Sequence, residues 1–461
     1  MLLLALARAA AAGEFQLPPV TRVTLENGLR VVVAEQREVP LVEMQLLIGA
    51  GSAQDPKGDD GAASLTARAL TRGAGDRSAV ELARAIESLG GELNAGAGTD
   101  ATIVTAEFLA EDFARGLGLV RDVVVAPRFE KDEVRRARDE QVATILATLE
   151  QPSAVADKCF SAFLYGAHPY GRPPDGSIAT VKGLGRGDVE DFYERWYHPN
   201  NALLVLVGAV SPDEAVAAVR QALGGWKPRP DAVPPRAAPP APLTARRVLL
   251  VDKADATQTQ IRFGNVAISR SHPDYLVASV GNTILGGGFT SRLIEELRVK
   301  RSLTYSAWSM FAARLLGGDF RVGTFTKSAT TVETLRLALS VAGEFRQTAP
   351  DAKALEKAKE YLTGQFPLRL ESPEALAARL AELEFHGLPE DELTTYQRRV
   401  RAVSATDVAA VAARVMPSPE QVAIVVVGKA AEVKGPLEAA FGEVQTVPAA
   451  ECEGLSRRDG H

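Results

Sequence analysis

The stretch Trp226–Thr244, WKPRPDAVPPRAAPPAPLT, divides this chain of 461 residues. Its seven prolines fix φ and remove backbone donors, so the stretch can neither continue a helix nor pair inside a sheet. An extended connector is expected, and we place a linker at 227–244. The linker separates a domain at 14–226 from a domain at 245–447, which is followed by a tail at 448–461.

The pieces on either side of the linker repeat one pattern. The run Leu203–Gly208 (LLVLVG) follows a helical segment and a short turn that contains proline, and so does the run Ala423–Gly428 (AIVVVG). Each run has the β-branched, continuously apolar character of a buried strand, and a second helical segment follows each. The two copies predict one duplicated fold.

Strand and helix signals alternate in both halves. In the first, the Asn27-Gly28 pair within 21–35 predicts a hairpin, strands are expected at 41–48 and 102–108, and helices at 61–72, 78–89, 110–125 and 131–149. In the second, strands are expected at 247–251, 258–264, 303–311 and 320–326, and helices at 275–285, 290–299, 332–347, 353–364 and 372–385. We therefore expect the α+β class, with two homologous domains, each a mainly antiparallel sheet with helices packed on one face.

Composition excludes several classes of protein. The hydrophobic content of 46% and charged content of 24% are those of an ordinary globular chain. The formal charge of −6, with no long basic run interleaved with aromatic residues, argues against a nucleic-acid partner. No stretch after the N-terminus is long and apolar enough to predict a membrane span.

The first 13 residues, MLLLALARAAAAG, combine an apolar run with an A-x-A-like end but lack a basic start. We interpret 1–13 as a clipped export signal, which predicts a periplasmic or otherwise exported protein. The alternative is an alanine-rich extension, which would leave the protein cytoplasmic.

The two cysteines, Cys159 and Cys452, lie far apart and form no CxxC motif. This spacing predicts neither a disulfide framework nor a thiolate metal site. A buried thiol at Cys159 and a thiol in the tail at Cys452 are expected.

Four segments resemble the pitrilysin or insulinase family of zinc peptidases, which includes the mitochondrial processing peptidase. They are TLENGLRVVV (24–33), GAGSAQDPKGDDGAASL (49–65), FYERWYHPNNALLVLVG (192–208) and LGGGFTSRLIEELRVKRSLTYS (285–306), and the resemblance runs from about Val20 to Val447. It implies two similar domains that form half of a clamshell.

Family peptidases carry H-x-x-E-H on a helix, with two histidines as zinc ligands and the glutamate as general base. Here the pentad reads Ser64-Leu65-Thr66-Ala67-Arg68, and a hydroxyl, a methyl group and a guanidinium cannot replace those groups. The resemblance places the third ligand at Thr144, and the nearby Glu140 is expected to be a solvated helix-face residue. The five histidines, at positions 168, 198, 272, 386 and 461, include no i,i+3 or i,i+4 pair, so no metal is expected on this chain.

Arg298 and Tyr305 match an arginine and tyrosine that family peptidases carry in the second domain. The resemblance implies that they face the zinc across the clamshell and position the substrate near the scissile carbonyl. The alternative is that Arg298 caps the C-terminus of its helix and Tyr305 packs in a strand. Gly286, Gly287 and Gly288 resemble a loop linked to substrate capture, although a tight turn opening a helix would also explain them.

We therefore expect a non-zinc subunit that is inactive alone and supplies Arg298 and Tyr305 to a homologous H-x-x-E-H subunit, which holds the zinc. An extended peptide would bind by adding a strand to a sheet edge. The alternative function is a noncatalytic peptide-binding or assembly scaffold. Autonomous catalysis is disfavoured, because a base is missing and no G-x-S-x-G elbow is present.

Overall fold

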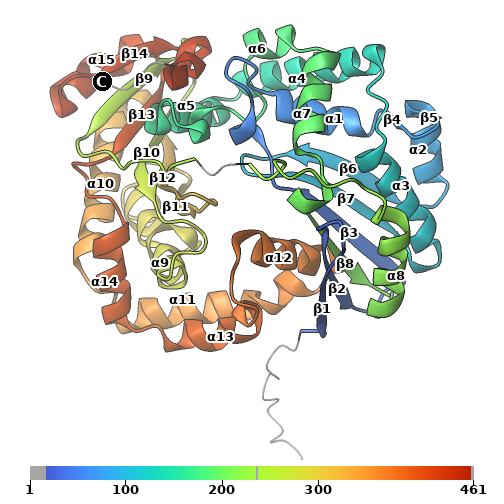
Figure 1. Ribbon diagram of the computed structural model, residues 1–461. Helices are drawn as coiled ribbons and strands as arrows, with labels where there is room; N and C mark the ends of the chain where they lie inside the picture. The colour runs from blue at the N-terminus through green and yellow to red at the C-terminus, as the bar shows by residue number, and fades with distance from the viewer. Residues whose placement is uncertain (1–16, 235–236, 458–461) are drawn as a thin grey trace, which may run out of the picture.

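The computed structural model describes residues 17–234 and 237–457, so the predicted export segment lies outside the described residues. The described chain forms two six-stranded sheets, each with its own set of helices (Figure 1). A small two-stranded ribbon, β4 (Gly73–Ala74) with β5 (Arg77–Ser78), accompanies the first sheet. No helix in the described ranges is long and apolar enough to cross a membrane.

Sheet one has the strand order β1-β2-β8-β3-β7-β6. Only β2 and β8 pair in parallel; the other neighbours are antiparallel. The predicted hairpin is confirmed, since β1 and β2 pair from Val20↔Ala34 to Thr24↔Arg30 around Gly28, whose φ is 88°. The strands are β1 (Val20–Thr24), β2 (Arg30–Glu35), β3 (Leu41–Ile48), β6 (Glu92–Ala97), β7 (Thr102–Leu109) and β8 (Ala202–Gly208).

Sheet two has the strand order β14-β9-β13-β10-β12-β11. Its strands β9, β13, β10, β12 and β11 correspond in order and direction to β2, β8, β3, β7 and β6 of sheet one. It differs at one edge, where β14 pairs with β9 in parallel and comes from the C-terminal end of the chain, whereas β1 is antiparallel and comes from the N-terminal end. The strands are β9 (Arg247–Asp252), β10 (Thr259–Ala267), β11 (Ala307–Ala312), β12 (Gly318–Thr326), β13 (Ala423–Gly428) and β14 (Gln445–Pro448). Two homologous, mainly antiparallel domains are thus observed as predicted.

The helices of each half bury apolar side chains against one face of their own sheet. Serine N-caps fix several helix starts; Ser211 in the first half and Ser404 in the second half, for example, each open a helix with a capping box. The first set is α1 (Ala62–Leu70), α2 (Ala79–Glu87), α3 (Phe113–Val125), α4 (Lys131–Leu149), α6 (Ile178–Gly183), α7 (Arg186–Trp196) and α8 (Pro212–Leu223). The second set is α9 (Tyr275–Asn282), α10 (Thr331–Gln347), α11 (Ala352–Gln365), α13 (Glu392–Ala402), α14 (Ala405–Val415) and α15 (Ala430–Phe441).

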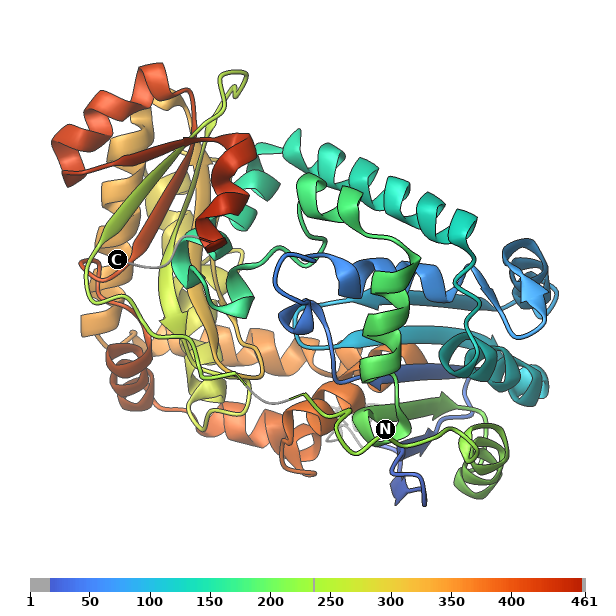
Figure 2. The same cartoon turned by 45° about the horizontal axis from the view of Figure 1, so that its top comes forward.

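The opposite face of each sheet is covered by one helix from the other half of the chain (Figures 1 and 2). Helix α5 (Pro152–Tyr165) packs on β9 and β13 of sheet two. Helix α12 (Pro373–His386) packs on β2, β3 and β8 of sheet one. This exchange adds a second covered face to the predicted architecture, and it joins the two halves through two buried interfaces.

The described part of the linker region, 227–234 and 237–244, contains no helix or strand. Asn200 holds one end of it against the first half: its Nδ2 donates to the carbonyl of Arg229 at 2.7 Å, and the Arg229 amide donates to Asn200 Oδ1 at 3.1 Å. The described proline-rich segment therefore lacks regular secondary structure, includes a turn closed by the Ala232 amide and the Arg229 carbonyl, and is held against the first half.

The prediction of two separate thiols is wrong. Cys159 on α5 and Cys452 on η9 (Ala449–Arg457) form a disulfide with a Cα–Cα distance of 5.4 Å. Sequence separation gave no indication of this bond, because the two residues meet only after α5 has crossed to sheet two, where the C-terminal segment also packs.

Candidate functional site

Helix α1 carries the pentad that resembles the zinc motif, and a buried carboxylate fixes its start. Asp55 accepts hydrogen bonds from the amides of Gly61 at 2.7 Å and Ala63 at 2.8 Å. Gly61 has φ 101°, a conformation that favours glycine. Burial raises the pKa of Asp55 to about 7, although the two amide donors act in the opposite direction.

The two positions that the resemblance assigns to zinc-binding histidines converge on one carboxylate. Ser64 Oγ donates to Asp175 Oδ1 at 2.8 Å, and Arg68 Nη2 lies 3.7 Å from the same oxygen. The loop that carries Asp175 is held on α1 by Gln141 of α4, whose amide donates to the carbonyls of Asp175 at 2.9 Å and Gly61 at 3.1 Å. We call Ser64, Arg68, Asp175 and Gln141 the Asp175 cluster.

The positions of the missing base and third ligand offer no replacement chemistry. Ala67 is fully buried, and Thr144 Oγ1 donates to the carbonyl of Glu140 within α4. Glu140 lies on the exposed face of α4 and forms a salt bridge with Arg72. The guanidinium of Arg68, within the pentad, repels a cation, so these residues do not fit zinc. In the described parts of the chain, no three His, Cys, Asp or Glu residues are grouped as a metal site.

Arg298 and Tyr305 both lie on the surface of the second half. Arg298 is in the last turn of the π-helix η6 (Ile294–Val299), and its guanidinium lies 5.8 Å from the ring centroid of Phe289. Tyr305 precedes β11 and is 76% exposed, which does not fit the alternative that it packs in a strand. Phe289 is 80% exposed, so we call Phe289, Arg298 and Tyr305 the Arg-Tyr surface.

The three glycines Gly286–Gly288 end one helix rather than open the next. Helix α9 runs into the π-helix η5 (Thr283–Gly287), a form that often marks functional sites. A Cβ on Gly286 would lie 2.4 Å from the backbone nitrogen of Ser309 on β11, so this glycine is required for packing. Asn282 adds a second contact between this helix and β11, because its side-chain amide donates to the Ser309 carbonyl at 3.0 Å.

The outer edges of the two sheets differ. Strand β6 ends sheet one, and among the described residues no backbone hydrogen bond crosses its outer edge. The equivalent strand of sheet two, β11, has its outer edge partly covered by η5 through Asn282 and Gly286. An open edge strand can accept an extended peptide by main-chain hydrogen bonding.

Sequence reasoning brought Ser64 and Arg68 to one place but missed Asp175. Nothing in a loop aspartate distinguishes it from other surface acids, so no local signal could have found it. It also missed the open edge of β6, because pairing partners are set by the whole sheet. Arg298 and Tyr305 lie in the second half, away from the Asp175 cluster in sequence, and no contact between the two sites occurs in the described residues.

The fold is a duplicated two-domain α+β architecture, and the positions that the resemblance assigns to zinc ligands hold Ser64, Arg68 and Thr144. Residues 30–174 match the family model described as Insulinase (Peptidase family M16), and residues 183–362 match the model described as Peptidase M16 inactive domain. An uncharacterised zinc protease of Mycobacterium tuberculosis is 30% identical over 85% of this chain and 89% of that protein. The chain belongs to the insulinase (M16) peptidase family, as the resemblance predicted.

Other relatives are named both as a zinc protease and as a non-peptidase. An uncharacterised zinc protease of Mycobacterium leprae is 34% identical over 63% of this chain and 65% of that protein. A protein of Helicobacter pylori that is 23% identical over 82% of this chain and 87% of its own length is named a non-peptidase homolog. A crystal structure of a peptidase M16 inactive domain from Pseudomonas fluorescens superposes with a TM-score of 0.84 at 28% identity, covering 89% of this chain and 98% of that one.

Proposed function

We propose that this chain is the non-zinc subunit of a two-subunit M16 peptidase and does not hydrolyse peptides alone. A homologous subunit with H-x-x-E-H would hold the zinc, and this chain would supply Arg298 and Tyr305 to that site. The observation that carries the proposal is the Asp175 cluster, in which Ser64 and Arg68 are already engaged with a carboxylate of their own chain.

The Arg-Tyr surface supports a role in trans. Tyr305 is 76% exposed and Arg298 is also exposed, so neither side chain gains much stability from burial, and packing does not explain why either is present. A guanidinium and a phenol are hydrogen-bond donors that can stabilise negative charge developing on a scissile carbonyl oxygen. In a clamshell, these donors would meet the peptide held near the partner's zinc.

Strand β6 supports peptide binding by the chain itself. Its unpaired outer edge can hydrogen-bond to an extended peptide whatever the peptide's sequence. This property would serve a peptidase subunit and a peptide-holding scaffold equally. The Helicobacter pylori relative named as a non-peptidase favours keeping the scaffold as the second candidate.

The substitutions Arg298→Ala and Tyr305→Phe distinguish the two candidates. In the reconstituted pair, each should lower turnover of a fluorogenic peptide by about tenfold to a hundredfold, the cost of removing one donor from an oxyanion site. Complex formation, measured by size-exclusion chromatography, should not change. Arg301→Ala is the matched control, because it removes an exposed arginine three residues from Arg298. Unchanged turnover in both variants would remove Arg298 and Tyr305 from catalysis and favour the scaffold.

A further inference from the structure

Helix α5 is anchored to the half of the molecule to which it does not belong in sequence. It follows α4 directly, through Gln151, yet its buried face packs on β9 and β13 of sheet two, with side chains such as Val155 and Phe160 against Leu249 and Val425. Because α4 packs in the first half, the position of α5 on sheet two determines how the two halves are joined.

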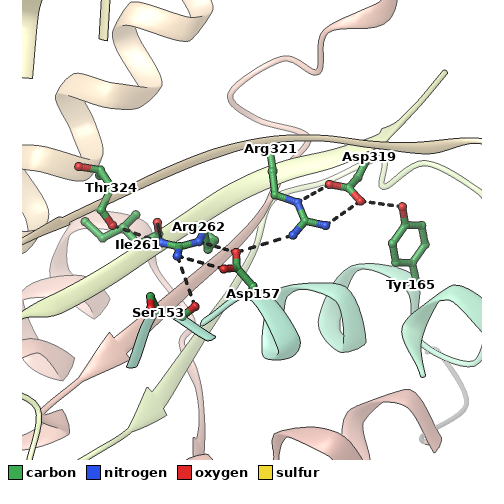
Figure 3. Close-up of polar contacts among 8 residues, drawn as sticks. All are labelled: Ser153, Asp157, Tyr165, Ile261, Arg262, Asp319, Arg321 and Thr324. Atoms are coloured by element: carbon green, nitrogen blue, oxygen red, sulfur yellow. Dashed lines mark hydrogen bonds and ion pairs between the residues drawn. The ribbon is translucent and has the colours of Figure 1, made fainter. Parts of the chain in front are cut away.

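Charged side chains on sheet two hold one side of α5 (Figure 3). Arg262 donates from Nε to Asp157 Oδ1 at 2.7 Å, and Arg321 Nη1 lies 3.7 Å from the same oxygen. Arg321 also donates from Nε to Asp319 Oδ2 at 2.6 Å, and Tyr165 donates to Asp319 Oδ1 at 2.9 Å. Two arginines and two aspartates therefore balance in charge at this interface, where Asp319 is fully buried and Asp157 is partly exposed.

The disulfide holds another side of α5. Cys159 lies in the middle of the helix, and Cys452 lies on η9, the last helical segment of the described chain. Both cysteines are fully buried in the same apolar cluster as the contacts of α5 with sheet two. A thiol at either position would be protected from solvent, so the bond must form before or while η9 docks.

We propose that the Cys159–Cys452 disulfide is an oxidative lock that holds η9 and α5 on sheet two and thereby fixes the junction between the two halves. Closing the lock removes two electrons and two protons from the thiols. A disulfide-donating oxidant accepts them: one cysteine thiolate attacks the donor's disulfide, and the other cysteine then displaces the donor as a second thiol. Reduction reverses the exchange and opens the lock.

The lock assigns the folding of this chain to an oxidising compartment, because buried structural disulfides form outside the reducing cytosol. This assignment is independent of the N-terminal sequence and agrees with the expectation of an exported protein. It is also independent of the proposed subunit function, since it depends on α5, η9 and sheet two rather than on the Arg-Tyr surface.

The first test is the thiol content of the full chain purified from the periplasm of a bacterial host. Unfolded without reductant, the protein should take up no maleimide, and after reduction it should take up two per chain, as measured by mass spectrometry. Two labels without reductant would overturn the lock, because the bond would then not form even in an oxidising compartment.

The second test is hydrogen–deuterium exchange of the wild type and of Cys159→Ala/Cys452→Ala. Peptides from η9 and α5 should exchange at least tenfold faster in the variant, whereas peptides from α12, which has no disulfide, should change by less than twofold. Equal exchange of η9 and α5 in the two proteins would overturn the lock even if the bond forms. If the variant does not fold, the oxidised and the reductant-treated wild type are compared by the same measurement, and equal rates have the same meaning.

Discussion

The two exchanged helices occupy equivalent places in the two halves but are held by different means. Helix α5 is bound to sheet two by a charge-balanced set of two arginines and two aspartates and by a disulfide. Helix α12 is bound to sheet one mainly through apolar side chains, with an ion pair between Arg22 and Glu384 at its margin. The junction of α5 with sheet two is therefore held by ion pairs and a covalent bond, whereas the junction of α12 with sheet one is held mainly by apolar contacts.

The junction between α12 and sheet one contains acids that form no ion pair with a cation within the described parts of the chain. Glu43 on β3 pairs in register with Glu107 on β7, which pairs with Glu92 on β6, and Glu374 of α12 lies close to Glu43. The pKa of Glu43 is raised to about 7: burial is the largest cause, the hydrogen bond from Gln45 acts in the opposite direction, and the negative charges of Glu107 and Glu374 add to the rise. The α12 junction should therefore depend on pH, whereas the α5 junction should depend on redox state.

The largest expected effect comes from breaking the charge balance under α5. Arg321→Met leaves Asp319, whose side chain is fully buried, without its guanidinium, and should lower the free energy of unfolding by about 3–5 kcal/mol. The matched change at the α12 junction is Arg22→Met on β1, which removes the partly exposed ion pair with Glu384 at the margin of sheet one and should cost about 1 kcal/mol or less. Urea unfolding measures both, and equal losses would remove the distinction between the junctions.

Opening the disulfide should have the next largest effect. The bond closes a loop across a separation of 293 residues, and native disulfides typically contribute about 2–4 kcal/mol. The midpoint of thermal unfolding should fall when wild-type protein is treated with reductant. Cys159→Ala/Cys452→Ala should start from the lower midpoint and show no response to reductant.

The pH dependence of stability should sharpen the comparison further. The pKa of Glu43 is 4.5 in the unfolded chain and about 7 in the folded chain. Between pH 4.5 and about pH 7 the folded state therefore holds a proton on Glu43 that the unfolded state has lost. The free energy of unfolding should fall as the pH rises through this range. The loss is on the order of 1–3 kcal/mol. Glu43→Gln should reduce this slope and be more stable than wild type at pH 8 but not at pH 4.5. Asp55 contributes in the same direction, so part of the slope should remain.

The smallest expected effect concerns the Asp175 cluster. Ser64→Ala removes one hydrogen bond to a carboxylate whose side chain is 47% exposed, so it should cost only about 0.5–1 kcal/mol. Asp175→Ala, which removes the accepting oxygen, should have a similar effect, and the double variant with Ser64→Ala should cost less than the sum, because both changes remove the same hydrogen bond. Additive losses in urea unfolding would indicate that Ser64 and Asp175 act separately.

Local sequence patterns predicted most of the individual elements. The β-branched runs 203–208 and 423–428, the Asn27-Gly28 turn and the proline-rich stretch each have a direct physical effect on the backbone, so the duplicated fold could be expected from them. The exchange of α5 and α12 could not, because an apolar helix face indicates burial but not which sheet buries it. The disulfide depends on that exchange of helices, and the Asp175 cluster depends on the position of the loop that carries Asp175. Neither could be predicted from the spacing of residues in the sequence.

The site was predictable to the extent that it depends on residue chemistry. Ser64, Ala67 and Arg68 cannot provide two imidazoles and a base wherever the chain places them. The exposure of Tyr305 and the required packing of Gly286 needed the three-dimensional arrangement, since a tyrosine before a strand and a glycine run have several uses.

The most direct test of the central claim is to measure bound zinc and peptide cleavage for this chain alone, for an H-x-x-E-H homologue from the same genome alone, and for the mixture. We predict no stoichiometric zinc and no cleavage for this chain, and cleavage by the mixture that exceeds that of the homologue and is lost with a chelator. Chelator-sensitive cleavage and one zinc per chain in the isolated protein would contradict the account.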